Sequence, residues 1–217
     1  MQGTGAFDMG YRKMGGGWGK RKRLIIGLVA AAMLGGPAQA QFSDSYKFLK
    51  AVRDRDGAVV TELVEGPGST IINTRDYSSG EAALHIVVKR RDAAWLAFLL
   101  AKGAKADIRD NEGNTPLGIA AQLGFVEGVQ TLTGQGAGVN LANVRGETPL
   151  ILAVHNRDIA TVRALLAAGA NPLLPDRIAG KSARDYAAED RRSAALLKLI
   201  DDAKPAKPKG KIAGPGL

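Results

Sequence analysis

A short pattern that returns every 33 residues limits this chain to a small set of folds. The segments Gly80-Glu-Ala-Ala-Leu84, Gly113-Asn-Thr-Pro-Leu117 and Gly146-Glu-Thr-Pro-Leu150 lie 33 residues apart, and Gly180-Lys-Ser-Ala-Arg184 follows after 34. A second marker keeps the same phase, because the Gly-Ala pairs that begin at residues 103, 136 and 169 are also 33 residues apart. Two landmarks with one period predict a stack of similar units, each of which buries its apolar face only against its neighbours.

Each unit is predicted to hold two short helices. The hydroxyl of Thr115 or Thr148 can cap the first helix, and the proline after each threonine fits the first helical position, where a missing N–H costs nothing. Leu117, Ala120 and Ala121 then share one face of that helix. The glycine of each Gly-Ala pair can end the second helix in the left-handed conformation. The pattern therefore predicts a helix-turn-helix unit.

The turn between the two helices carries Arg-Asp in three units, at 55–56, 91–92 and 157–158. Aspartate suits the N-terminus of the second helix, because its carboxylate accepts free N–H groups and meets the positive end of the helix dipole. A solvent-exposed turn without a cap is the alternative.

The third unit contains the weak point that we expect in the stack. Thr133 stands where the second and fourth units have leucine, so it forfeits part of a burial worth roughly 1.5–3 kcal/mol. Gly134 costs about 1 kcal/mol of helix propensity.

A period of 33 with Thr-Pro-Leu near the front and Leu-Leu-x-x-Gly-Ala near the back resembles the ankyrin repeat, over residues 46–203. The match is complete at residues 115–117 and 148–150, whereas the second repeat keeps Leu84-His85 but lacks Thr-Pro. The resemblance implies an all-α solenoid of about five stacked helix-turn-helix units joined by β-hairpin-like loops. The approximate repeats are 46–73, 74–106, 107–139, 140–172 and 173–203, and the first and last depart from the pattern, as terminal units do.

The resemblance also implies roles for individual residues. The family's histidine makes a structural hydrogen bond between repeats, and His85 matches it. The hairpin tips and the exposed side of the first helices form a concave surface that holds protein partners. Carried onto this sequence, that surface comprises Ser78, Ser79, Glu81, Lys89, Arg90, Asn111, Glu112, Asn114, Gln122, Leu123, Val144, Arg145, Glu147, His155 and Asn156. For His155 a plain solvated side chain is the alternative.

Residues 1–40 are predicted to be a secretory signal peptide. Residues 12–23 carry six Lys or Arg, an apolar run follows from Leu24 to Leu34, and Ala38 and Ala40 have the spacing that a signal peptidase accepts. We therefore expect cleavage after Ala40 and a periplasmic or secreted protein that begins at residue 41. An uncleaved helix that tethers the protein to a membrane is the alternative. The start codon can correspond to residue 1, 9 or 14, all of which are methionine.

The net charge of +9 does not predict a nucleic-acid-binding protein. Residues 41–203 hold 20 basic and 20 acidic residues, so the excess lies in the signal peptide and in residues 204–217, which carry four Lys and no acid. A nucleic-acid binder concentrates positive charge on its folded face. The Pro- and Lys-rich tail is predicted to be disordered. A protein partner is expected, and the alternative is an envelope-polymer or membrane-surface protein in which the tail makes weak contact with anionic lipid.

No arrangement of residues in the sequence predicts catalysis. The chain has no cysteine, and its two histidines lie in different repeats, too far apart to share a metal ion. Gly180-Lys181-Ser182 resembles the end of a phosphate-binding loop, but Pro175 occupies the position where that loop needs glycine. We therefore expect a non-catalytic, monomeric module without cofactor or metal.

Overall fold

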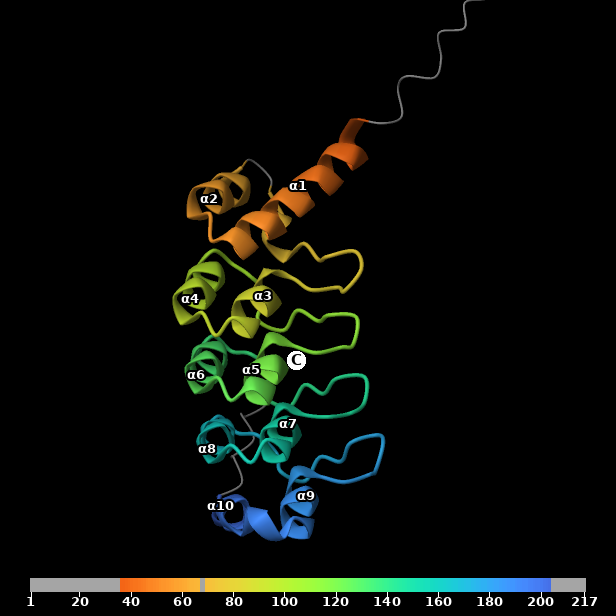
Figure 1. Ribbon diagram of the computed structural model, residues 1–217, viewed down its shortest axis with the longest axis vertical. Coiled ribbons are helices and arrows are strands. Elements are labelled where there is room, and N and C mark those ends of the chain that lie inside the picture. The colour runs from red at the N-terminus through yellow and green to blue at the C-terminus, as the bar shows by residue number, and fades with distance from the viewer. Residues whose placement is uncertain (1–35, 67–68, 204–217) are drawn as a thin grey trace, which may run out of the picture. The chain divides into compact units, whose positions relative to one another are not determined.

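The computed structural model describes residues 36–66 and 69–203, with side chains from residue 44 onward (Figure 1). Residues 1–35 of the predicted signal peptide and the whole predicted tail, 204–217, lie outside the described residues. Within the described ranges, no helix combines the length and the apolar character needed to cross a membrane.

The described residues form five pairs of helices that stack one on the next (Figure 1). The first helices α3, α5, α7 and α9 pack against one another in one layer, and the second helices α4, α6, α8 and α10 pack in another. This confirms the predicted all-α solenoid. The helices are α1 (Gly36–Asp54), α2 (Gly57–Glu65), α3 (Ala83–Lys89), α4 (Ala93–Ala101), α5 (Pro116–Leu123), α6 (Val126–Gly134), α7 (Pro149–His155), α8 (Ile159–Ala167), α9 (Ala183–Glu189) and α10 (Ala194–Asp202), with 3-10 turns η1 (Ile71–Asn73) and η2 (Arg191–Ser193).

Hairpin-like loops precede α3, α5, α7 and α9, and all project to the same side of the stack (Figure 1). Each is closed by a backbone hydrogen bond, such as the one from the Asp76 N–H to the Glu81 carbonyl at 2.8 Å. No extended strand occurs within the described ranges. Successive loops are joined by further backbone hydrogen bonds of 2.8–3.1 Å. The N–H groups of Asn111, Val144 and Arg177 donate to the carbonyls of Ser79, Glu112 and Arg145, respectively.

The first helices begin as the sequence predicts. The hydroxyl of Thr115 accepts the N–H of Gly118 at 3.1 Å, and that of Thr148 accepts the N–H of Ile151 at 3.3 Å. Leu117, Ala120 and Ala121 are fully buried on the shared face of α5. They belong to one hydrophobic core that runs from the first unit to the last.

The three aspartates of the helix turns are caps, which decides between the two interpretations. Asp56, Asp92 and Asp158 accept N–H groups of the first turn of α2, α4 and α8 at 3.0–3.2 Å. The arginine before each aspartate has a φ of 53–60°, so it lies in the left-handed region that glycine usually occupies. The glycines at 103, 136 and 169 also have positive φ after the second helices, as predicted.

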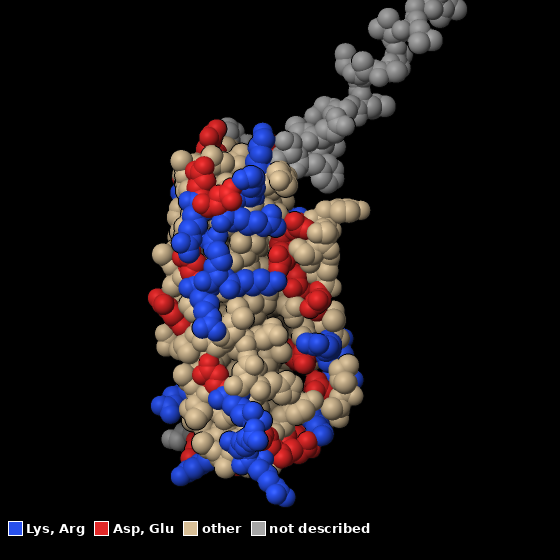
Figure 2. Space-filling model, in the orientation of Figure 1, with Lys and Arg blue, Asp and Glu red and all other residues tan. Residues whose placement is uncertain are grey.

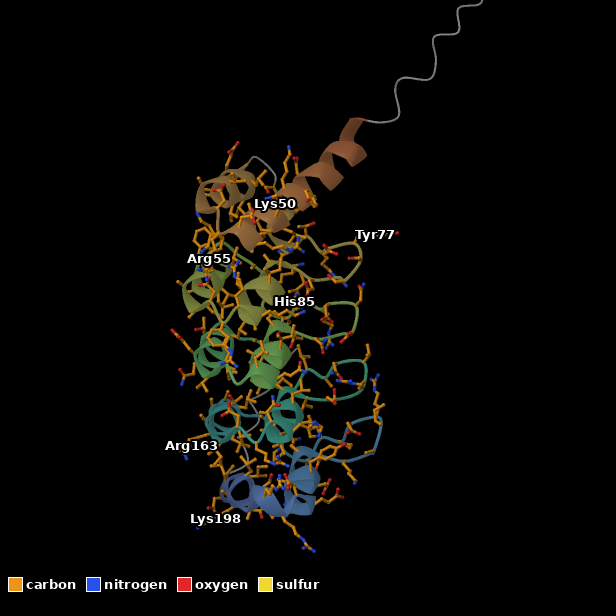
Figure 3. The ribbon with its side chains drawn as sticks, viewed as in Figure 1. Lys50, Arg55, Tyr77, His85, Arg163 and Lys198 are labelled. Atoms are coloured by element: carbon orange, nitrogen blue, oxygen red, sulfur yellow. The ribbon has the colours of Figure 1, made fainter. Side chains whose placement is uncertain are left out.

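His85 ties the second unit to the third inside the core. The residue lies on α3 (Figure 3) and is fully buried. The Ala82 N–H donates to Nδ1 at 3.0 Å, so Nε2 carries the proton and donates to the Asn114 carbonyl at 3.1 Å. Burial lowers the pKa of His85 below 6.5, because the imidazolium loses hydration there. The inter-repeat hydrogen bond that the resemblance implied is confirmed.

Three polar side chains that the sequence analysis did not identify also join the units. Each lies about one period from the next and accepts a backbone N–H of the following unit at 2.8 Å. The acceptors and donors are Asn73 and Lys105, Asp107 and Gly138, and Asn140 and Asn171. The stack is therefore held by polar contacts along its edge as well as by its apolar core.

Candidate functional site

An open groove of about 650 Å³ crosses the second, third and fourth units. Hairpin loops of the second and third units form one wall, and α5 with the ends of α3 and α7 forms the floor. Ten of the predicted surface residues line it: Ser78, Ser79, Glu81, Lys89, Asn111, Glu112, Asn114, Gln122, Leu123 and Asn156. Two further lining residues, Asp110 and Ile119, were missed by the sequence analysis.

Asp110 holds the hairpin wall of the groove in shape. Its Oδ1 accepts the N–H groups of Glu112 and Asn114 at 2.9 and 2.8 Å, and its Oδ2 accepts the side-chain amide of Asn114 at 3.0 Å. Asp76, Asn143 and Asp176 bind the N–H groups of their own loops in the same way. An acidic or amide residue three or four positions before each repeated glycine was the available sequence signal.

The carboxylates of Asp76 and Asp176, in the loops of the second and fifth units, are held in their ionised form. The Ser78 hydroxyl and the N–H groups of Ser79 and Ser78 hold the pKa of Asp76 well below 3.8. Burial acts to raise the pKa of Asp176, but hydrogen bonds from the Tyr186 hydroxyl and from three backbone N–H groups outweigh it, so the pKa is lowered. The same contact with Asp176 raises the pKa of Tyr186 to about 12. Both loops therefore carry a negative charge at neutral pH.

The tip of the hairpin wall is fixed by side-chain contacts between neighbouring units. The Asn111 side-chain amide donates to the Ser78 carbonyl at 2.9 Å, and Arg75 Nη2 donates to Asn111 Oδ1 at 3.0 Å. Asn111 also donates its backbone N–H to Ser79. The polar rim of the groove is therefore built before any ligand arrives, which lowers the entropic cost of binding.

The floor of the groove combines apolar and polar groups. Leu123 is half-buried and offers most of the apolar surface, because Ile119 is only 5% exposed, and Gln122 is exposed beside them. The last carbonyls of α5 are already occupied, because the Asn156 side-chain amide donates to Gln122 and the Arg91 guanidinium donates to Leu123. Ligand contacts on this floor are therefore left to side chains.

The groove carries more negative than positive charge. Glu81, Asp110 and Glu112 line it, against one ammonium group, that of Lys89, which forms an ion pair with Glu81. Glu112 is exposed and contacts Asn114. Figure 2 shows acidic side chains along the hairpin side of the upper stack, basic side chains over the adjoining part of the same face, and a largely uncharged band at the height of α5 and α7. A ligand of the groove therefore meets an acidic wall.

Arg90 is one of five predicted surface residues that do not line the groove. Its Nη1 donates to the carbonyls of Val52 and Arg53, at 2.7 and 2.9 Å, where α1 ends. Its Nη2 lies 3.4 Å from Asp92. The structure places this guanidinium as a clamp between the first two units.

The other four lie lower on the stack. Val144, at the tip of the fourth unit's hairpin, is 58% exposed, and Arg145 forms an ion pair with Glu147 at 2.7 Å. His155 is exposed and meets the Tyr186 ring edge-on, with the ring centroids 4.4 Å apart. These residues continue the hairpin side beyond the groove.

Among the described residues, no group of three His, Asp or Glu side chains is arranged to hold a metal ion. Both ring nitrogens of His85 are already engaged in hydrogen bonds in the core. Tyr77 is exposed at a hairpin tip and projects away from the stack (Figure 3). In the described part of the chain, neither residue is hydrogen-bonded to a side chain that could act with it as a nucleophile or a general base. The groove offers surfaces for binding.

Comparison with known proteins agrees with this arrangement. The family model for ankyrin repeats in three copies matches residues 48–143, and the model for a single ankyrin repeat matches residues 145–177. Together these ranges cover more than half of the chain. An ankyrin repeat-containing protein of Treponema pallidum (strain Nichols) is 31% identical over 141 residues, which is 64% of this chain and 46% of that protein. The chain thus spans less than half the length of this relative.

Proposed function

Because this chain belongs to the ankyrin-repeat family, we propose that it is a non-catalytic module that binds a partner protein in the groove across its second, third and fourth units. Ankyrin repeats generally serve protein–protein interaction. The observation that carries the choice of face is the groove itself, whose polar wall is fixed by hydrogen bonds between loops and whose floor offers Ile119 and Leu123.

The dimensions of the groove favour a polypeptide over a small molecule. Its lining comes from three successive units and lies open to solvent, so it cannot enclose most of a drug-sized ligand, as small-molecule sites do. Most of its lining side chains are polar or charged, and Ile119 and Leu123 of α5 add apolar ones. Such mixed polarity suits the interface of a non-obligate protein complex.

We further propose that the module acts outside the cytoplasm, in the periplasm or after secretion. The support is the basic segment, the apolar run and the small-residue motif that end at Ala40. N-terminal sequencing of the protein from its native host is expected to begin at Gln41. A protein that keeps residues 1–40 and sediments with membranes would show instead that the segment is a tether.

Two glutamines of the third unit provide a matched test of the binding face. Gln122 is exposed in the groove, and Gln130 is exposed on α6, outside it. A photo-reactive amino acid placed at position 122 in the native host is expected to give a discrete cross-linked species on irradiation, and one placed at 130 is not. Equal capture from both positions, or capture from 130 alone, would place the interaction elsewhere.

A charge reversal then asks whether the groove itself recognises the captured protein. Glu112→Lys changes an exposed groove carboxylate whose backbone contacts stay in place. Glu127→Lys, on the outer helix α6 of the same unit, is the control. Loss of the species captured from position 122 in the first variant and its retention in the second is the expected result.

A further inference from the structure

We propose that the hairpin tips of the second, fourth and fifth units rest on an anionic membrane surface, where Tyr77, Val144 and Ile178 enter the headgroup layer. The contact goes beyond the proposed function, because these tip residues do not line the groove and the contact can be measured without a partner protein. Three observations carry it: the exposure of the three side chains, an arginine beside each of them, and the alignment of the tips.

Each of these three tips holds a large apolar side chain in water. Tyr77 is 96% exposed and Ile178 is 75% exposed, and Val144 is exposed as well. Six large apolar side chains are exposed among the residues whose side chains the structure describes, and half of them stand at these tips. Isolated exposed apolar residues need no explanation, but these three recur at one structural position. Their recurrence points to a shared apolar contact.

An exposed arginine lies within two residues of each apolar tip residue, at Arg75, Arg145 and Arg177. Arg75 donates to two neutral groups, the Gly80 carbonyl and Asn111 Oδ1. Arg145 is paired with Glu147, but the arginine side chain is 56% exposed and the glutamate 13%, so the outer side of the pair is positive. The tips therefore combine an apolar group with a positive one.

The acidic residues of the same hairpins do not cancel this charge. Asp176 is buried, and both Asp176 and Asp76 accept N–H groups of their own loops. Asp76 also lies 3.3 Å from Arg53. Glu112 is exposed at the tip of the third unit, beside Asn111, and no large apolar side chain stands there. The third tip is therefore the one that takes no part in the contact.

The arrangement of the tips fits a lipid surface better than a protein. The hairpins all project to one side and end along a line that follows the stack (Figure 1), and backbone hydrogen bonds hold them in register. The three apolar side chains stay in separate units, whereas the centre of a protein interface is a continuous packed area. A fluid bilayer accepts separate side chains, tyrosine is enriched at headgroup level, and anionic lipid attracts arginine.

A fluorophore on a single introduced cysteine tests the contact, because the chain has no cysteine of its own. An environment-sensitive label is attached to the full chain through Val144→Cys, and vesicles of phosphatidylcholine and phosphatidylglycerol are added. The emission is expected to move to shorter wavelength and to be quenched by nitroxides on the lipid chains. The same label attached through Ile159→Cys, at the start of α8 where the native side chain is 44% exposed, should stay unchanged. The label reports its own surroundings, so binding of the vesicle by another segment cannot imitate this result.

Substitutions in the chain labelled at position 144 then separate the apolar part from the charged part. Ile178→Ser should raise the lipid concentration at half-maximal change about tenfold, the value for burying one aliphatic side chain. Arg177→Gln should raise it about fivefold, as expected for one cation near anionic headgroups. Ile159→Ser and Arg163→Gln, both on α8 and exposed, are the controls and should have no effect.

Three results would overturn the proposal: no spectral change at position 144 with vesicles, equal changes at 144 and 159, or a label at 144 that is shielded by a protein and not by lipid. Each of them leaves the capture of a partner from position 122 untouched, because that experiment reads the groove and not the tips.

Discussion

Replacing His85 with alanine tests whether a buried hydrogen-bonded ring holds the second and third units together. The substitution leaves the Ala82 N–H without an acceptor in a place where Ala82 is only 1% exposed. The Asn114 carbonyl keeps one donor, the Asp110 N–H at 3.1 Å. One orphaned N–H costs about 1–3 kcal/mol, and the space left by the ring adds to it. We expect the free energy of unfolding to fall by about 2–4 kcal/mol.

The same residue predicts how stability depends on pH. Because the folded protein holds the pKa of His85 below its ordinary value of 6.5, the unfolded chain binds the extra proton first as the pH falls. The contribution of His85 is therefore complete above about pH 6.5 and is lost below it, by up to about 1.4 kcal/mol per pH unit until the folded pKa is reached. Asp76 and Asp176 do not interfere between pH 5 and 7, because their pKa values lie below 3.8.

Urea unfolding followed by circular dichroism at pH 7 and pH 5 measures both effects. His155→Ala is the control, since it makes the same substitution at an exposed ring. The wild type and the control should lose stability between pH 7 and 5, and His85→Ala should lose much less. A His85→Ala protein within 1 kcal/mol of wild type at pH 7, or with the wild-type pH dependence, would refute the reasoning.

The remaining predictions concern single positions in the lower units. Gly134→Ala should stabilise the protein by about 0.5–1 kcal/mol, because Gly134 is exposed at the end of α6 with open space around a new Cβ, and a thermal melt would show it. Gly146→Ala should cost at least about 2 kcal/mol in the same assay, because its φ is 81° and the Cβ would lie 2.5 Å from the Arg177 nitrogen. A hydrogen bond from Arg157 lowers the pKa of Asp190 to about 2, so the ionised carboxylate stabilises the fold above pH 3.8 and this contribution is lost as the pH falls through about 2. Asp190→Asn should remove the contribution, and thermal melts of the variant and the wild type should therefore converge at low pH.

The elements that the sequence predicted are those set by short-range chemistry. Thr115 and Thr148 act within one helical turn, and the glycines act on their own backbone, so the period alone placed them. Arg90 was assigned to the concave surface from its repeat position, yet its direction is decided by the carbonyls at the end of α1, 37 and 38 residues away in the chain. Asp110 acts locally, because its carboxylate accepts N–H groups of its own loop. It was missed because the residue at this place varies between aspartate and asparagine, and its distance from the repeated glycine varies between three and four positions.

All three left-handed arginines reach the following unit: Arg91 donates to the Leu123 carbonyl, and the other two contact aspartates. Arg55 Nη2 reaches Asp92 of the next unit at 2.9 Å, and Arg157 Nε reaches Asp190 at 2.5 Å. In both of these contacts the aspartate caps a helix of the following unit, α4 for Asp92 and the 3-10 turn η2 for Asp190. Positive φ costs a non-glycine residue about 1–2 kcal/mol, so these contacts must offset a backbone penalty.

The third unit departs from this arrangement, and its departure lies beside the groove. Gly124, with φ of 66°, stands where the first, second and fourth units have arginine, and a Cβ there would meet the carboxylate of Asp158. With no side chain at 124, a second shallow hollow of about 470 Å³ opens next to the groove and shares Gln122, Leu123 and Asn156 with it. Any side chain at 124 would therefore require the Asp158 carboxylate to move. Glycine thus gives up the inter-unit contact that arginine makes elsewhere and leaves room for the Asp158 carboxylate beside the groove.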